Sequence, residues 1–141
     1  MGVQVTESGN FTWPLRVYYE DTDSGGVVYY ANYLRYLERA RTEWLRSLGF
    51  DQARLASDRG LLFAVREVHL DLRRPARLDD HLQVTADVAE RRGASLLFDQ
   101  VVTRDGETDP LCHGRVRVAC LAADSFRPKP LPDDLLAEID R

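Results

Sequence analysis

The spacing of apolar positions changes along the chain, from a short run near the N-terminus to a helical period and then to alternation. Residues 15–20 are rich in β-forming side chains and predict a strand. Residues 1–13 are polar and lack a period, so we expect a loose N-terminal lead-in there. Two acids and two glycines within residues 21–26 are typical of a tight turn.

A helical period covers residues 31–48, and Gly49 predicts its C-terminal end. A second, short helix is expected over residues 51–59. Arg41 projects into the apolar arc of the first helix. Its guanidinium either reaches water or pairs with an acid, or it serves as an internal anchor near a site or an interface. At 100° per residue, the apolar arc comprises Tyr33, Leu34, Leu37, Ala40, Trp44, Leu45 and Leu48.

From Gly60 onward apolar and polar residues alternate, which predicts four strands. Turns near residues 75–80, 92–94 and 105–107 are short and favour antiparallel pairing. Residues 128–141 read as a proline-rich connector and a short C-terminal helix. The first strand of the series is expected to place one set of side chains on one face: Leu62, Ala64, Val68, Leu70 and Leu72.

One helix with an apolar face and one curled antiparallel sheet form two layers around a single core. The sequence therefore predicts an α+β hotdog fold, with one long central helix wrapped by a sheet of about five strands. The length of 141 residues suits a single domain spanning 1–141. Exposed sheet edges need protection, so we expect pairing between two subunits at an edge.

Composition and charge narrow the class of protein. A formal net charge of −4 does not suggest a nucleic-acid partner. No apolar stretch approaches the roughly 20 residues that cross a bilayer, and the N-terminus lacks a signal-peptide pattern. We therefore expect a cytosolic protein. The two cysteines, Cys112 and Cys120, lie in a strand-like segment and are expected to be small buried residues.

The candidate chemistry lies in residues 18–36, where an acidic glycine turn precedes the helix. A helix start offers free backbone N–H donors for developing negative charge, and a nearby Asp offers a base or a nucleophile. The acids Glu20, Asp21 and Asp23 either cap the turn and the helix, or one of them faces a cleft. The turn lacks a downstream Glu at calcium-loop spacing, which disfavours metal binding.

Other familiar site patterns are missing from the sequence. The Gly25-Gly26 pair does not fit a phosphate-binding loop, and no Gly-x-Ser-x-Gly elbow occurs. The pairs Arg73-Arg74 and Arg91-Arg92 are either solvated turn residues or a rim that attracts the phosphates of a nucleotide-bearing ligand. The histidines are dispersed and expected to be structural or solvated: His69, His81 and His113.

Residues 16–29 read RVYYEDTDSGGVVY, and residues 38–44 read ERARTEW. Together with residues 31–33, 75–80 and 92–98, these stretches resemble the 4-hydroxybenzoyl-CoA thioesterase family of hotdog proteins. The nearest branch is the YbgC-type, Tol–Pal-associated acyl-CoA thioesterases. The resemblance covers nearly the whole chain from Trp13 onward, and the first stretch is the most specific.

This resemblance implies hydrolysis of an acyl-CoA or acyl-carrier-protein thioester without a cofactor, because CoA is part of the substrate. Asp23 matches the family's catalytic carboxylate and would act as nucleophile or as the base that activates water. The backbone N–H of Tyr30 would stabilise the oxyanion, and Tyr19 would position the substrate near the carboxylate. The predicted substrate-binding residues are Gly26, Val27, Arg91 and Arg92.

The sequence departs from the YbgC-type pattern at Tyr30, where that pattern has His. A backbone donor survives this change, whereas Tyr, with an ordinary pKa near 10, is a poor base at neutral pH. The alternative is therefore a non-catalytic acyl-CoA or acyl-carrier-protein binding protein. A dehydratase or isomerase would require a His near the helix, and residues 14–60 contain none.

The resemblance also concerns assembly and location. It implies a homodimer or homotetramer with the cleft between subunits. It further implies a cytoplasmic protein that acts near lipid metabolism or the Tol–Pal envelope system. Charge and hydropathy separately predict no nucleic-acid partner and no transmembrane segment.

Overall fold

The computed structural model describes residues 4–5 and 11–141, and predictions for the remaining residues lie outside this range. Among the described residues, none of the helices is long and apolar enough to cross a membrane. The elements in chain order are β1 (Gln4–Val5), β2 (Phe11–Arg16), the 3₁₀ helix η1 (Tyr19–Asp21), α1 (Asn32–Ser47), α2 (Gln52–Arg59), β3 (Leu61–Leu72), β4 (His81–Arg92), β5 (Ser95–Arg104), β6 (Pro110–Ala122) and α3 (Asp133–Ile139).

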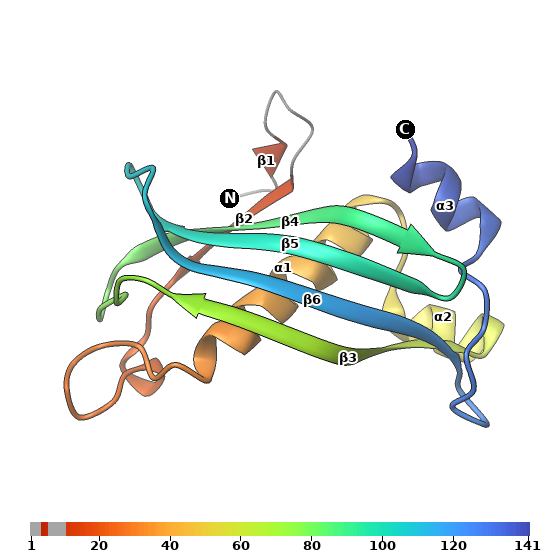
Figure 1. Cartoon of the computed structure of the whole chain (residues 1–141), viewed down its shortest axis with the longest axis horizontal. Coiled ribbons are helices and arrows are strands. Elements are labelled where there is room, and N and C mark those ends of the chain that lie inside the picture. Colours follow the sequence, from red (N-terminus) through yellow and green to blue (C-terminus); the bar gives the residue numbers. More distant parts are fainter. Residues whose placement is uncertain (1–3, 6–10) are drawn as a thin grey trace.

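The strands form one antiparallel sheet in the order β1-β2-β4-β5-β6-β3. Helix α1 runs behind this sheet, whereas α2 and α3 lie toward one end of it (Figure 1). Five long strands and the two-residue β1 make up the sheet. The prediction of an α+β hotdog fold with one helix against a curled antiparallel sheet is confirmed.

Helix α1 packs against the sheet through one apolar stripe. The predicted positions Tyr33, Leu37, Ala40 and Leu45 are buried. The prediction is wrong for Leu34, which is 42% exposed. The stripe instead follows the spacing i, i+3, i+4, i+7 and includes Tyr36, which is fully buried.

A glycine in the sheet leaves room for a side chain of α1. Gly114 lies in β6 directly below the helix, and a Cβ atom at this position would lie 2.5 Å from Cδ1 of Leu37 and 3.3 Å from Cδ2 of Leu70. No side chain larger than hydrogen fits there without displacing these leucines. The small residue therefore lets α1 sit deep in the concave face.

The first strand differs from its prediction at both ends. Strand β2 begins at Phe11, so residues 11–13 of the predicted loose lead-in belong to the sheet. It ends at Arg16, which pairs with His81 at the start of β4. Val17 still forms backbone hydrogen bonds with Asp79 and Asp80. After it, Tyr19–Asp21 form the 3₁₀ helix η1 rather than the end of a strand. Backbone pairing, which propensity does not reveal, decides both boundaries.

Strand β3 carries a bulge that the sequence pattern did not predict. The register between β3 and β6 shifts between Val65 and Glu67. A bulge exchanges the two faces of a strand, so Phe63 and Val65 line the same side of the sheet as Val68. The prediction that Leu62 and Ala64 share a face with Val68, Leu70 and Leu72 is therefore wrong.

The short helices lie where the sequence places them. Helix α2 begins after Asp51, whose carboxylate accepts a hydrogen bond from the Arg54 N–H at 3.1 Å. It ends at Gly60, which adopts a left-handed conformation with a φ of 64°. Helix α3 follows the proline-rich connector, as expected.

Candidate active site

The acidic turn is a small hairpin that precedes α1. Thr22 and Val28 form a β-bridge, and the Asp23 N–H donates to the Val27 carbonyl at 2.9 Å. The Gly26 N–H donates to the Asp23 carbonyl at 3.0 Å, which closes the turn. Gly26 has a φ of 79°, a conformation that favours glycine. The hairpin therefore fixes the backbone of Asp23 at the first position of a tight turn.

The Asp23 carboxylate is exposed and held from one side. Its Oδ1 accepts a hydrogen bond from the Gly25 N–H at 2.8 Å. A Cβ atom at Gly25 would lie 3.2 Å from this oxygen, so glycine leaves room for the carboxylate. Within the described residues, Oδ2 has no hydrogen-bond partner. One carboxylate oxygen is thus oriented by the protein and the other is available to a ligand or to water.

Asp21 has a different role, although it lies only two residues earlier. It is 8% exposed, and its Oδ2 accepts from the Tyr18 N–H at 2.9 Å. Its carbonyl accepts from the Tyr29 N–H at 2.9 Å and from Nδ2 of the buried Asn32 at 2.8 Å. Burial, with the nearby Asp21 carboxylate, raises the pKa of the Tyr36 phenol. Asp21 therefore joins η1, the hairpin and α1, whereas Asp23, within the hairpin, and Glu20, in η1, face solvent.

The start of α1 presents unbonded donors beside this hairpin. The first turn is closed by hydrogen bonds from the Asn32 N–H to the Tyr29 carbonyl at 2.8 Å and from the Tyr33 N–H to the Tyr30 carbonyl at 3.2 Å. The N–H groups of Tyr30 and Ala31 have no acceptor in the part of the chain that the structure describes. The positive end of the helix dipole reinforces such donors. This arrangement can stabilise a negative charge that develops on a substrate oxygen.

The tyrosines around the hairpin face outward. The Tyr30 ring is exposed and lies 5.0 Å from the Tyr29 ring, centroid to centroid. Tyr19 is 81% exposed and borders a surface hollow with Tyr18 and Leu78, and Asp23 does not line that hollow. Among the described residues, no hydrogen bond joins the Tyr19 side chain to the Asp23 carboxylate.

The predicted substrate-binding residues lie in two separate regions of the structure. Gly26 and Val27 belong to the hairpin, and a bridge between Val27 and Arg77 docks it on the β3–β4 connection. Arg91 and Arg92 lie at the far end of β4, where they form ion pairs with Asp140 and Glu90, respectively.

The length of β4 separates these two places. The β4–β5 turn and the loop before α1 lie at opposite ends of the sheet (Figure 1). At about 3.3 Å per residue, β4 is on the order of 35 Å long. The structure therefore does not bring Arg91 and Arg92 to Asp23 within one chain.

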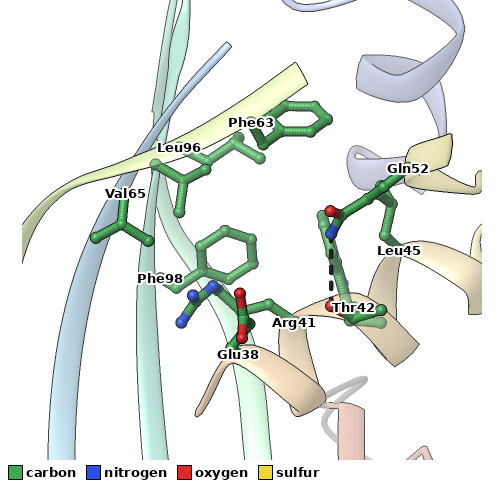
Figure 2. Close-up of a pocket in the computed structure, with 11 residues that line it drawn as sticks. Glu38, Arg41, Thr42, Leu45, Gln52, Phe63, Val65, Leu96 and Phe98 are labelled. Atoms are coloured by element: carbon green, nitrogen blue, oxygen red, sulfur yellow. Dashed lines mark hydrogen bonds between the residues drawn. The ribbon is translucent and has the colours of Figure 1, made fainter. Parts of the chain in front are cut away.

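Sequence reasoning missed a pocket between the C-terminal half of α1 and the strands β3, β5 and β6. Its polar residues include Arg41, Thr42 and Gln52, and Nε2 of Gln52 donates to Oγ1 of Thr42 at 3.4 Å (Figure 2). The only signal for it in the sequence was a charged residue, Arg41, within the apolar arc. The opposite wall includes Phe63 and Val65, which the sequence pattern assigned to the other face of β3 because it did not predict the bulge. The remaining lining residues are Glu38, Trp44, Leu45, Leu96, Phe98 and Val118.

Neither the hairpin nor the pocket around Arg41 contains a cluster of metal ligands among the described residues. In residues 4–5 and 11–141, no group of three or more His, Cys, Asp or Glu side chains could hold a metal ion. Cys112 and Cys120 are both free and buried, as expected.

The fold and the hairpin at the start of α1 define a hotdog protein of the thioesterase class. A model of the thioesterase-like superfamily matches residues 17–139, and the chain belongs to that family. It is 45% identical over 127 residues to the acyl-CoA thioesterase YbgC of Haemophilus influenzae, which covers 90% of this chain and 92% of that protein. It is 44% identical over 128 residues to the acyl-CoA thioester hydrolase YbgC of Escherichia coli, over 91% of this chain and 94% of that one.

Solved structures have the same fold. A 1,4-dihydroxy-2-naphthoyl-CoA thioesterase from Synechocystis superposes with a TM-score of 0.86 at 24% identity, over 94% of this chain and 96% of that one. A probable thioesterase from Bartonella henselae superposes with a TM-score of 0.82 at 34% identity, over 87% and 99% of the two chains. The resemblance to the YbgC-type thioester hydrolases is thus confirmed.

The link between Asn32 and Asp21 can be tested by substitution. Asn32→Ala removes the buried amide donor and leaves the Asp21 carbonyl with one partner fewer, so we expect the free energy of unfolding to fall by about 1–3 kcal/mol. Urea denaturation measures it. Ser24→Ala, an exposed change in the same hairpin, is the control and should stay within about 0.5 kcal/mol of the unchanged protein. Equal stability of both variants would contradict a locking role for Asn32.

Proposed function

We propose that this protein hydrolyses the thioester bond of acyl-CoA and releases the free acid and CoA. The observation that carries the proposal is the exposed carboxylate of Asp23 in a hairpin docked beside the unbonded N–H groups at the start of α1. The relatives named acyl-CoA thioesterase or thioester hydrolase, at 45% and 44% identity over about nine-tenths of the chain, support it. Acyl-carrier-protein thioesters carry the same reacting bond and are a second substrate class.

In the proposed reaction, the N–H of Tyr30 donates to the thioester carbonyl oxygen and stabilises the oxyanion of the tetrahedral intermediate. One such donor contributes about 3–4 kcal/mol at the transition state. Asp23 either attacks the carbonyl carbon or removes a proton from the water that attacks it. Direct attack expels the CoA thiolate and leaves a mixed anhydride, which water then hydrolyses. General-base attack by water gives the acid and the thiol in one addition and elimination. Neither route uses a cofactor.

The replacement of the expected His by Tyr30 fits a role for the backbone rather than the side chain at this position. The Tyr30 ring is exposed and lies beside the Tyr29 ring. The N–H group is the same whichever side chain follows it. We therefore assign the oxyanion donor to the backbone of Tyr30.

We propose further that the protein is a cytoplasmic homodimer or larger homo-oligomer. Among the described strands, β3 forms an edge of the sheet and spans twelve residues. Its side chains Val65, Val68 and Leu72 are exposed large hydrophobics. An edge of this length with an apolar face favours pairing with a second copy across a two-fold axis. A cytoplasmic location agrees with CoA thioesters as substrates.

Asp23→Asn tests the role of the carboxylate. The amide is neither a base nor a nucleophile, so we expect kcat to fall at least about 100-fold, while acyl-CoA still binds. Release of CoA thiol from a panel of short, long and aromatic acyl-CoAs measures the rate. Glu20→Gln, a neighbouring exposed acid, is the control and should keep kcat within about 3-fold. Full turnover by Asp23→Asn would refute the assignment. Binding without hydrolysis by the unchanged protein would favour the acyl-CoA binding alternative.

Two substitutions at Tyr30 separate the backbone from the side chain. Tyr30→Phe keeps the N–H group and should keep kcat within about 3-fold. Tyr30→Pro removes it without breaking a hydrogen bond among the described residues, and kcat should fall roughly 100- to 1,000-fold. Thermal unfolding should show that both variants are folded. A large loss in Tyr30→Phe would instead assign the role to the phenol.

Val68→Lys tests the proposed subunit contact. A charge on the apolar face of β3 should prevent burial against a second copy, so the mass from light scattering should fall to that of one chain. His69→Lys is the matched control, because the next residue of a strand points to the opposite face. It should leave the assembly intact. A monomeric unchanged protein, or an intact oligomer in Val68→Lys, would show that β3 is not the contact.

A further inference from the structure

Arg41 is a half-buried cation whose hydrogen-bond acceptor is neutral. Its Nη1 donates to Oε1 of Gln100 at 3.0 Å, and the guanidinium lies 6.0 Å from the centre of the Phe98 ring. Within the described part of the chain, no carboxylate oxygen lies within 4.0 Å of it. Several other arginines also lack an ion pair among the described residues, but they are exposed, whereas Arg41 is half-buried.

The position of Arg41 is fixed by a second buried group. Gln100 is fully buried, and its Nε2 donates to the carbonyls of Leu37 and Thr85, each at 3.0 Å. These two bonds orient the amide so that its oxygen faces Arg41. A guanidinium has five N–H donors, and this acceptor engages one nitrogen. Among the described residues, the remaining donors have no hydrogen-bond acceptor, so they can bind a ligand in a set direction.

Burying the Arg41 guanidinium without a carboxylate partner costs free energy. Desolvation lowers the pKa of the Arg41 guanidinium, and the charge of Glu38 opposes that effect. Arginine nevertheless stays protonated in proteins. A desolvated cation is stabilised most by an anion that meets it with paired hydrogen bonds. The site therefore selects for a negatively charged group.

Arg41 lies where two hollows along α1 meet. A groove between α1 and β3, lined by Leu34, Val65 and Val68, leads to Arg41, and the pocket in Figure 2 continues beyond it. Arg41 and Val65 line both. At 1.5 Å per residue of helix, Arg41 lies about 16 Å along α1 from Tyr30. The groove offers apolar walls for methylene groups, and the charged residues Arg35, Glu38 and Arg41 line its helix side. Of these three, Arg41 is the half-buried one.

We propose that Arg41 binds a carboxylate at the distal end of the acyl group, so that the protein prefers ω-carboxyacyl thioesters. This inference rests on the proposed function, because it names the substrate class of the same site. The apolar groove takes the methylene groups, and the guanidinium forms charge-assisted hydrogen bonds with the terminal carboxylate. Glu38, exposed and one turn earlier on α1, competes with that carboxylate for Arg41.

The test compares mono-CoA thioesters of dicarboxylic acids with methyl-terminated acyl-CoAs of the same chain length. At one chain length or more, the unchanged protein should show a kcat/KM at least about 10-fold higher for the ω-carboxy substrate. Arg41→Met should lower that value about 10- to 100-fold and change the value for methyl-terminated substrates less than about 3-fold. Glu38→Gln should raise the ω-carboxy value. Arg41→Lys keeps the positive charge but lacks the planar guanidinium. Its kcat/KM for the ω-carboxy substrate should lie between the values of the unchanged protein and of Arg41→Met.

A second readout keeps this inference separate from the proposed reaction. Calorimetric titration of the same CoA thioesters into Asp23→Asn, with and without Arg41→Met, measures binding without turnover. A selective loss of ω-carboxy binding supports the Arg41 assignment even if no acyl-CoA is hydrolysed. An equal loss for both substrate series, or no preference in the unchanged protein, overturns it. A fall of Arg41→Met to the monomer mass also overturns it, because Arg41 would then serve the subunit contact.

Discussion

The burial of one stripe of α1 in the concave face of the sheet is the constraint on which the rest of the structure depends. Tyr36, Leu37 and Ala40 are fully buried there, and Gly114 in β6 lets the helix approach the sheet closely. A helix packed this tightly has a fixed start, since interiors are close-packed and shift little. The donors at its first turn are therefore held in place before any substrate arrives, which is the condition for electrostatic stabilisation of an oxyanion.

Two acids in one turn have acquired different roles from their surroundings. Asp21 is buried, and both its carboxylate and its carbonyl accept hydrogen bonds that connect η1, the hairpin and α1. Asp23 is exposed, with one oxygen held by the Gly25 N–H. The first acid keeps the hairpin against the helix, and the second presents its carboxylate to solvent. Because Asp21 holds the hairpin in place, the backbone of Asp23 has a defined position.

The pocket between α1 and the sheet contains a second polar site, around Arg41. A bulge in β3 turns Phe63 and Val65 toward the helix, and together with Phe98 they form apolar walls around Arg41 (Figure 2). Gln100 connects β5 to α1 and fixes the guanidinium at the same time. In the proposed site, the groups at the start of α1 would contact the thioester, and Arg41 would bind the other end of the same acyl group. Reaction and selectivity would then depend on the same helix.

The sequence by itself determined the long helix over residues 31–48 and the alternating strands after it, and it predicts Asp23 as the acid that acts beside the helix start. Local periodicity and the quoted stretch of the family carry that information. Only the tertiary structure decided that Tyr36 rather than Leu34 is buried and that residues 11–13 join the sheet. The same holds for the distance of Arg91 and Arg92 from Asp23 within one chain and for the pocket around Arg41. These features depend on strand register, on a bulge and on which surfaces meet across the core. Such contacts join residues far apart in sequence, so no local pattern specifies them.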